Sequence, residues 1–111
     1  MSIRILVVDD NDILREDLCQ QLALQPDFTV AGSAATGAEA VRLALETDCD
    51  VILMDIEMES IRAGIDAAAQ IHPQRPKIQI IYLTAHDNDD MILTAMATGA
   101  VDYFVKGSDY D

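Results

Sequence analysis

The stretch Ile3-Arg4-Ile5-Leu6-Val7-Val8-Asp9-Asp10 decides the fold, because a short apolar run ends abruptly on two carboxylates. Three later, mostly apolar runs also end on a polar side chain: residues 51–54 on Asp55, 78–83 on Thr84, and 102–105 on Lys106. Continuous apolar runs of this kind are typical of strands covered on both faces in a parallel sheet. Parallel strands would bring the polar groups to the sheet edge where open α/β proteins bind their ligands.

The segments between these runs have helical periodicity. Leu14, Leu18 and Leu22 recur at the spacing of one helix face, and Thr36 to Glu39 form a capping box that opens a second helix. A short strand is predicted at residues 28–31, and two further helices at 61–71 and between 87 and 99. The chain is therefore predicted to be an α/β domain of four strand–helix units followed by a fifth strand.

Length and charge indicate one domain covering residues 1–111. Half of the 111 residues are hydrophobic, which is enough for one core in a chain near the lower end of the roughly 100 to 200 residues of a single domain. Twenty Asp and Glu against seven Lys and Arg give a formal net charge of -13. This charge repels nucleic-acid phosphates and anionic lipid headgroups, so direct nucleic-acid binding by this segment is not expected.

The sequence gives no sign of a membrane or export signal. No apolar stretch approaches the roughly 20 residues that span a bilayer, and the N-terminus lacks the basic region and apolar core of a signal peptide. Cys19 and Cys49 have no second thiol or His at ligand spacing, so we expect reduced thiols that are buried or half-buried. We therefore expect a cytoplasmic protein.

Each polar residue at a strand end also has a simpler interpretation. Asp9 and Asp10 could cap a helix, Asp55 could belong to a turn, Thr84 could be an ordinary strand residue, and Lys106 could be a solvated surface residue. Taken singly, these interpretations are preferred. Turn chemistry gives no reason, however, for complementary groups to be selected at one edge of the sheet, so their joint placement favours a functional site.

The chemistry that this set of groups supports is phosphoryl transfer. Mg²⁺ prefers oxygen ligands, which Asp9, Asp10 and Asp55 would supply, and the ion would relieve the repulsion among them. Asp55 stands alone at the end of a central strand and is the predicted nucleophile, forming an acyl phosphate. Lys106 can neutralise one phosphoryl oxygen and Thr84 can donate its hydroxyl to another.

At these residues the chain resembles the receiver domains of two-component response regulators. Asp9-Asp10 matches the acidic pair of that family, Met54-Asp55 its phosphoacceptor, Leu83-Thr84-Ala85 its switch hydroxyl, and Gly99-Ala100 with residues 103–106 its last strand. The match covers residues 3–106. It implies a flavodoxin-like, doubly wound sheet of five parallel strands in the order 2-1-3-4-5.

The resemblance further implies a role for each site residue and a set of partners. Asp55 would accept a phosphoryl group from a sensor histidine kinase, a phosphotransfer protein or a small acyl phosphate, and the Glu57 carbonyl would be a fourth Mg²⁺ ligand. Thr84 and Tyr103 would form a switch that changes the surface of the fourth helix and fifth strand. Taken alone, Tyr103 is an amphipathic ring at a sheet edge, with its hydroxyl in water.

The chain departs from the usual receiver pattern in three places. Met58 is followed by Glu59 where most receivers have Pro, and Gly64 comes about one residue late. Lys106 is followed by Gly107 where many receivers have Pro. The sequence ends at Asp111, where a fifth helix would only be starting, so we expect a receiver that lacks most or all of this helix. Such a chain would be marginally stable alone, or would cover the bare sheet face by self-association or by exchanging an element between chains.

Two other classes of protein share parts of this pattern. A flavodoxin-like electron carrier would need a phosphate-binding Ser, Thr and Gly loop after the first strand, where this chain has Asp9-Asp10. A phosphatase of the haloacid-dehalogenase type also uses an Asp nucleophile but expects a second Asp two residues later, where this chain has Glu57. A flavin spectrum would favour the first, and multiple turnover of a phosphomonoester would favour the second.

Overall fold

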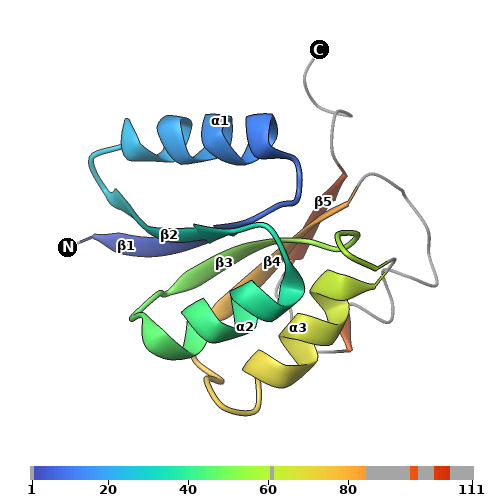
Figure 1. Cartoon of the computed structure of the whole chain (residues 1–111). Coiled ribbons are helices and arrows are strands. Elements are labelled where there is room, and N and C mark those ends of the chain that lie inside the picture. The colour runs from blue at the N-terminus through green and yellow to red at the C-terminus, as the bar shows by residue number, and fades with distance from the viewer. Residues whose placement is uncertain (1, 61, 85–95, 98–101, 106–111) are drawn as a thin grey trace.

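The computed structural model describes residues 2–60, 62–84 and 96–97, and the backbone of 102–105. Over residues 3–84, strands and helices alternate along the chain in the predicted way (Figure 1). The elements are β1 (Ile3–Val8), α1 (Asp12–Ala23), β2 (Phe28–Ala34), α2 (Gly37–Glu46), β3 (Val51–Asp55), α3 (Ala63–Ile71), β4 (Gln79–Thr84) and β5 (Asp102–Val105).

The strands form one parallel sheet in the order β2-β1-β3-β4-β5. The predicted α/β parallel sheet is thereby confirmed, and β3 is its central strand. The order places the ends of β1, β3 and β4 next to one another: Val8 pairs with Met54, and Asp55 pairs with Leu83. Because all the strands run the same way, their carboxyl ends meet at one edge of the sheet.

The main core lies between the sheet and the helices α2 and α3, which cover one face together (Figure 1). From the sheet it takes large side chains that alternate along the strands, such as Ile52, Met54, Ile80 and Tyr82, all with 0% exposure. The helices contribute mainly small residues, among them Ala40, Ala44 and Ala68. Small helix residues allow the two helices to approach the sheet and each other closely.

The other face of the sheet carries α1, alone among the described helices (Figure 1). No residue of α1 is fully buried, and the predicted inner stripe of Leu14, Leu18 and Leu22 is only half-buried. On β3 and β4, Leu53 and Leu83 are also half-buried, whereas the residues before and after each of them in sequence are buried. This face is therefore the less densely covered of the two in the described part of the chain.

Two boundaries differ by more than one residue from those expected from the sequence. β2 runs three residues further than predicted, to Ala34, although Gly32 and Ser33 resemble turn residues. It does so because β1 continues beside it: Ile5 pairs with Val30 and Leu6 with Gly32, which leaves Ala31 as one extra residue in β2. α3 begins at Ala63 and so starts two residues later than predicted.

Some predictions concern parts of the chain that the structure does not describe. The fourth helix falls on such residues except at 96–97, and the missing fifth helix concerns residues after 105, which also lie outside the described ranges. Among the described residues, no helix has the length and apolar character needed to cross a membrane.

Candidate functional site

The carboxyl ends of β1, β3 and β4 carry four of the predicted site residues. Asp9 and Asp10 directly follow β1, Asp55 is the last residue of β3, and Thr84 is the last residue of β4. β3 pairs with β1 on one side and with β4 on the other. The fold therefore brings these four residues to the same edge of the sheet, as the sequence predicts.

Three of these residues form an acidic cluster, which we define as Asp9, Asp10 and Asp55. Each offers one carboxylate oxygen, and the three oxygens lie within 4.8 Å of one another. Asp9 is 0% exposed and Asp55 is 3% exposed, whereas Asp10 is exposed. Negative charges held this close and largely away from water repel one another unless a cation or proton compensates them. The arrangement thus favours a bound cation.

The turn from β1 to α1 holds Asp9 in place through its backbone and side chain. The N–H of Asn11 donates to Asp9 Oδ1 at 2.9 Å, and Arg15 Nη1 donates to the Asp9 carbonyl oxygen at 2.8 Å. Asn11 Oδ1 in turn accepts the Leu14 N–H and caps α1. Arg15 Nη2 also donates a hydrogen bond to Asp12 Oδ1 at 2.6 Å. Nothing in the sequence spacing of Arg15 predicts its contact with the Asp9 carbonyl.

The acceptor loop, residues 56–60, leaves Asp55 and is fixed at its start by two backbone hydrogen bonds. The Ile56 N–H donates to the Leu83 carbonyl at 3.1 Å, and the Gly64 N–H donates to the Ile56 carbonyl at 2.8 Å. A third bond, from the Met58 N–H to the Ser60 carbonyl at 3.0 Å, closes a tight turn. Glu57 lies half-buried inside this loop. The late position of Gly64 therefore still gives an ordered turn.

Glu59 joins the acceptor loop to the start of α2. Both of its carboxylate oxygens lie 2.9 Å from the Gly37 nitrogen, and Oε2 also accepts the Ala38 N–H at 3.4 Å. Partial burial raises the pKa of Glu59, but hydrogen bonds from Gly37, from its own backbone N–H and from Ala38 outweigh this effect. The pKa therefore lies below its ordinary value of 4.5. Sequence reasoning noted Glu59 only as a departure from Pro.

The three remaining predicted residues differ in how far the structure describes them. Thr84 is 2% exposed at the end of β4, beside the strand that carries Asp55. Tyr103 lies in β5, and its backbone pairs with Tyr82 of β4. The side chain of Tyr103 is outside the part of the chain that the structure describes. Lys106 lies outside the described residues altogether, so its predicted place beside the acidic cluster stays a prediction.

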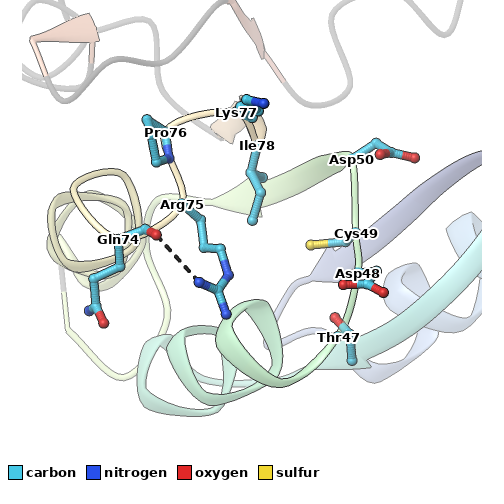
Figure 2. A pocket seen from close by; sticks show the side chains of 9 residues that line it. All are labelled: Thr47, Asp48, Cys49, Asp50, Gln74, Arg75, Pro76, Lys77 and Ile78. Carbon is cyan, nitrogen blue, oxygen red and sulfur yellow. Dashed lines mark hydrogen bonds between the residues drawn. The ribbon is translucent and has the colours of Figure 1, made fainter.

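A hollow of about 280 Å³ lies at the opposite edge of the sheet, where β3 and β4 begin (Figure 2). Cys49, Arg75, Lys77 and Ile78 are among the residues that line it. Arg75 Nη2 donates to the Leu45 carbonyl at 3.0 Å and so ties the loop before β4 to the end of α2. The full length of the strands separates this hollow from the acidic cluster, so the two are distinct.

Comparison with known proteins identifies the class to which this fold and acidic cluster belong, the regulatory phosphoacceptor domains of two-component signalling. Within that class, the chain belongs to the response regulator receiver domain family, whose model matches residues 5–111. The predicted receiver domain is thereby confirmed. The flavodoxin-like carrier and the phosphatase, which share only parts of the pattern, are not supported by this membership.

Individual relatives agree with the family assignment. The chain is 42% identical over 106 residues to the transcriptional regulatory protein LiaR of Bacillus subtilis, covering 96% of this chain and 50% of LiaR. A LuxR-family two-component response regulator from Aurantimonas has a TM-score of 0.90 at 33% identity, covering 98% of this chain and 77% of that one. The response regulator domain of Thermotoga maritima CheB has a TM-score of 0.88 at 37% identity, covering 97% and 81%. The chain spans about half the length of the curated relatives that it matches.

Proposed function

We propose that this chain is a phosphorylation-dependent signalling switch whose phosphoacceptor is Asp55. The observation that carries the proposal is the acidic cluster, three carboxylate oxygens within 4.8 Å of one another in a receiver-family chain. Asp55 ends a central strand and is nearly buried, so its surroundings are fixed by the sheet. Asp9 and Asp10 then serve as cation ligands.

The oxygen donors of this edge fit Mg²⁺. The ion takes a few carboxylates and retains waters in its remaining positions, so three carboxylates at this spacing suffice without a dedicated cage. Asp9, Asp10 and Asp55 would hold it through side-chain oxygens and Glu57 through its backbone carbonyl. When bound, the ion offsets the negative charge of the acidic cluster and of the incoming phosphoryl oxygens.

The transfer itself needs a nucleophile and charge compensation. A carboxylate oxygen of Asp55 attacks the phosphorus, and an O–P bond forms while the P–N bond of a phosphohistidine breaks. The imidazole keeps the electron pair and is protonated; with a small acyl phosphate, a P–O bond breaks and the carboxylate leaves instead. Thr84 donates its hydroxyl to one phosphoryl oxygen, and Lys106 neutralises another.

Phosphorylation would act on the rest of the domain through Thr84 and Tyr103. Thr84 ends β4 beside Asp55, and Tyr103 lies on the neighbouring strand, paired with Tyr82. Movement of the Thr84 hydroxyl toward the phosphoryl group frees space that the Tyr103 ring occupies. This step would change the surface formed by the fourth helix and β5, and so pass the signal to an effector.

The partners follow from the same proposal. Residues 1–111 form one receiver domain whose phosphoryl donor is a sensor histidine kinase or a phosphotransfer protein, acting in the cytoplasm. Relatives named as transcriptional regulatory proteins suggest that the output is control of transcription. With a net charge of -13, the receiver itself would not hold the DNA.

Treatment with acetyl phosphate tests the acceptor directly. The chain should gain one labile phosphoryl adduct by intact-mass measurement when Mg²⁺ is present, and none in excess chelator. Asp55→Asn should gain no adduct in either condition. An adduct that persists in Asp55→Asn, or that forms equally well without Mg²⁺, would show that Asp55 is not the metal-assisted acceptor.

The role of Lys106 is tested with beryllofluoride, a mimic of the aspartyl phosphate. In the wild type, the NMR resonances of Tyr103 and of the fourth-helix surface should shift when beryllofluoride is added with Mg²⁺. In Lys106→Ala, Mg²⁺ binding should persist while these shifts are lost. Equal shifts in the two proteins around Tyr103 would rule out Lys106 as the link between the phosphoryl charge and the last loop.

A further inference from the structure

The backbone N–H groups in the first turn of α2 donate hydrogen bonds to acceptors from two different parts of the chain. Thr36 Oγ1 accepts the Glu39 N–H at 3.1 Å, and the Thr36 carbonyl accepts the Ala40 N–H. The N–H groups of Gly37 and Ala38 donate instead to Glu59, which is 22 and 21 residues further along the chain. The first turn of a helix leaves such N–H groups without partners in the helix itself. Glu59 thus completes this turn from the acceptor loop.

The contact is close and favoured by charge. A carboxylate at a helix N-terminus benefits from the positive end of the helix dipole, and hydrogen bonds to an ionised acceptor are among the stronger ones. The backbone at Gly37 also packs tightly, because a Cβ added there would lie 2.9 Å from the Ala63 carbonyl oxygen. The starts of α2 and α3 are therefore held against each other at the point where Glu59 reaches across.

The same contact restrains the acceptor loop at its far end. Hydrogen bonds to Leu83 and from Gly64 fix the loop at Ile56, next to Asp55. Glu59 fixes it three residues later, so Glu57, the proposed carbonyl ligand, lies between two anchored points. Loss of the Glu59 contact would leave the bonds at Ile56 and those from Met58 and Ala63 to the Ser60 carbonyl, but would remove the link between the loop and α2. The loop would then spend part of its time with the Glu57 carbonyl turned away from the acidic cluster.

From this geometry we infer that Glu59 is a positioning residue for the metal and phosphoryl site, acting through the Glu57 carbonyl rather than by touching the ion. The inference rests on the proposed function, because it assumes that the acidic cluster and Glu57 bind Mg²⁺. A purely structural role, as a cap of α2, would stabilise the helix without affecting Mg²⁺ binding. The two roles therefore differ in a measurable quantity, the Mg²⁺ dissociation constant.

The test compares Mg²⁺ affinity in four variants of the full chain. Glu59→Ala removes the contact, and Glu59→Gln keeps one oxygen that can accept from Gly37. Thr36→Ala removes the other cap of the same helix. Asp66→Asn removes one negative charge from an exposed residue that, together with Gly37 and Glu59, lines a groove between α2 and α3. Thr36→Ala controls for helix stability, and Asp66→Asn controls for the change in net charge.

The expected result is selective weakening of Mg²⁺ binding. Residues that orient metal ligands typically contribute about 10-fold or more to affinity, so the Mg²⁺ dissociation constant should rise by about that factor in Glu59→Ala and by less in Glu59→Gln. Thr36→Ala should remain within about twofold of wild type because it leaves the acceptor loop and all charges unchanged, and Asp66→Asn should do so because a single exposed charge is largely screened by salt. Phosphorylation by acetyl phosphate should need correspondingly more Mg²⁺ in Glu59→Ala.

Other outcomes separate a failure of this inference from a failure of the proposed function. If Thr36→Ala or Asp66→Asn weakens Mg²⁺ binding as much as Glu59→Ala does, helix stability or charge explains the effect and the inference is wrong. It is also wrong if Glu59→Ala binds Mg²⁺ like wild type. If Glu59→Ala does not fold, the same comparison is made with Glu59→Ser, whose shorter side chain lacks the carboxylate, and a wild-type Mg²⁺ affinity in that variant overturns the inference. A wild-type chain that takes no phosphoryl group in Mg²⁺ would instead refute the proposed function.

Discussion

Gly64 lies against the carbonyl oxygen of Asp55 so closely that a Cβ built at Gly64 would be 1.9 Å from that oxygen. The same Cβ would lie 2.9 Å from the Ile56 Cα, so the close approach involves backbone on both sides. The Gly64 N–H meanwhile donates to the Ile56 carbonyl. A side chain at this position would therefore have to displace the backbone of the proposed acceptor residue itself.

We predict that Gly64→Ala destabilises the domain and impairs the site. Forcing extra atoms into a packed interior costs about 1 to 3 kcal/mol, and here the obstructing atoms are backbone. Denaturant unfolding should show this loss, and the rate of phosphorylation by acetyl phosphate should fall. Gly32→Ala is the control, because its Cβ would meet only side chains, the nearest at 3.6 Å. Equal stability of the two variants would contradict the prediction.

Mg²⁺ should raise the thermal stability of the wild-type chain. An ion that binds only the folded state stabilises it by about 2.7 kcal/mol at 100 times its dissociation constant. Asp10→Asn should lose most of this effect, and without Mg²⁺ it should melt at a higher temperature than wild type, because one repelling charge is gone. Asp17→Asn, which changes an exposed acid on α1, should respond to Mg²⁺ as wild type does. A melting temperature of Asp10→Asn that rises with Mg²⁺ as in wild type would remove Asp10 from the ligands.

The contribution of Glu59 to stability should depend on pH. Its pKa is lower in the folded chain than its ordinary value of 4.5, so the stabilisation is fully present above about pH 4.5 and is lost as the pH falls through the folded-state pKa. In metal-free buffer at neutral pH, the wild type should melt at a higher temperature than Glu59→Gln. The difference between the two melting temperatures should shrink below pH 4.5. Glu46→Gln, which removes an exposed pair with Arg42, should show little gap at any pH. If the difference in melting temperature between wild type and Glu59→Gln is the same from pH 7 to pH 3, the ionised Glu59 carboxylate does not stabilise the fold.

Both thiols should react slowly at neutral pH, and Cys49 should be the slower. Burial is the main cause that raises the pKa of each, and it outweighs the opposing hydrogen bonds and charges. Cys49 is 7% exposed, whereas Cys19 on α1 is only half-buried. In a Cys19→Ser variant, labelling by a thiol reagent should become fast only when denaturant is added. Rapid labelling of native Cys19→Ser would show that Cys49 is open to solvent.

The acidic cluster could be predicted from the sequence because parallel strands convert a one-dimensional pattern into a shared edge. Once the apolar runs that end at Asp9, Asp55 and Thr84 are parallel and adjacent, their last residues must come together. The order of neighbouring strands, by contrast, came from the family resemblance, because hydrophobic patterning alone does not determine it. The sheet described here agrees with that order.

The supporting contacts could not be predicted in the same way. Glu59 reaches Gly37 across 22 residues, and its position depends on how an acceptor loop with one extra residue folds. Arg15 looked like an ordinary polar helix residue, because nothing in its spacing reveals a bond to the Asp9 carbonyl. Likewise, Gly32 and Ser33 resemble turn residues, yet they extend β2 because β1 offers them hydrogen-bonding partners.

The extra residue Ala31 has a consequence for how copies of this chain meet. β2 is an outer strand of the sheet, and an outer strand exposes backbone groups on which a strand from another molecule can pair and start an aggregate. The irregular register at Ala31 bends and twists such a strand, so a straight incoming strand would lose its match partway along. The bulge at Ala31 therefore disfavours fibre-like stacking of one sheet on the next through β2.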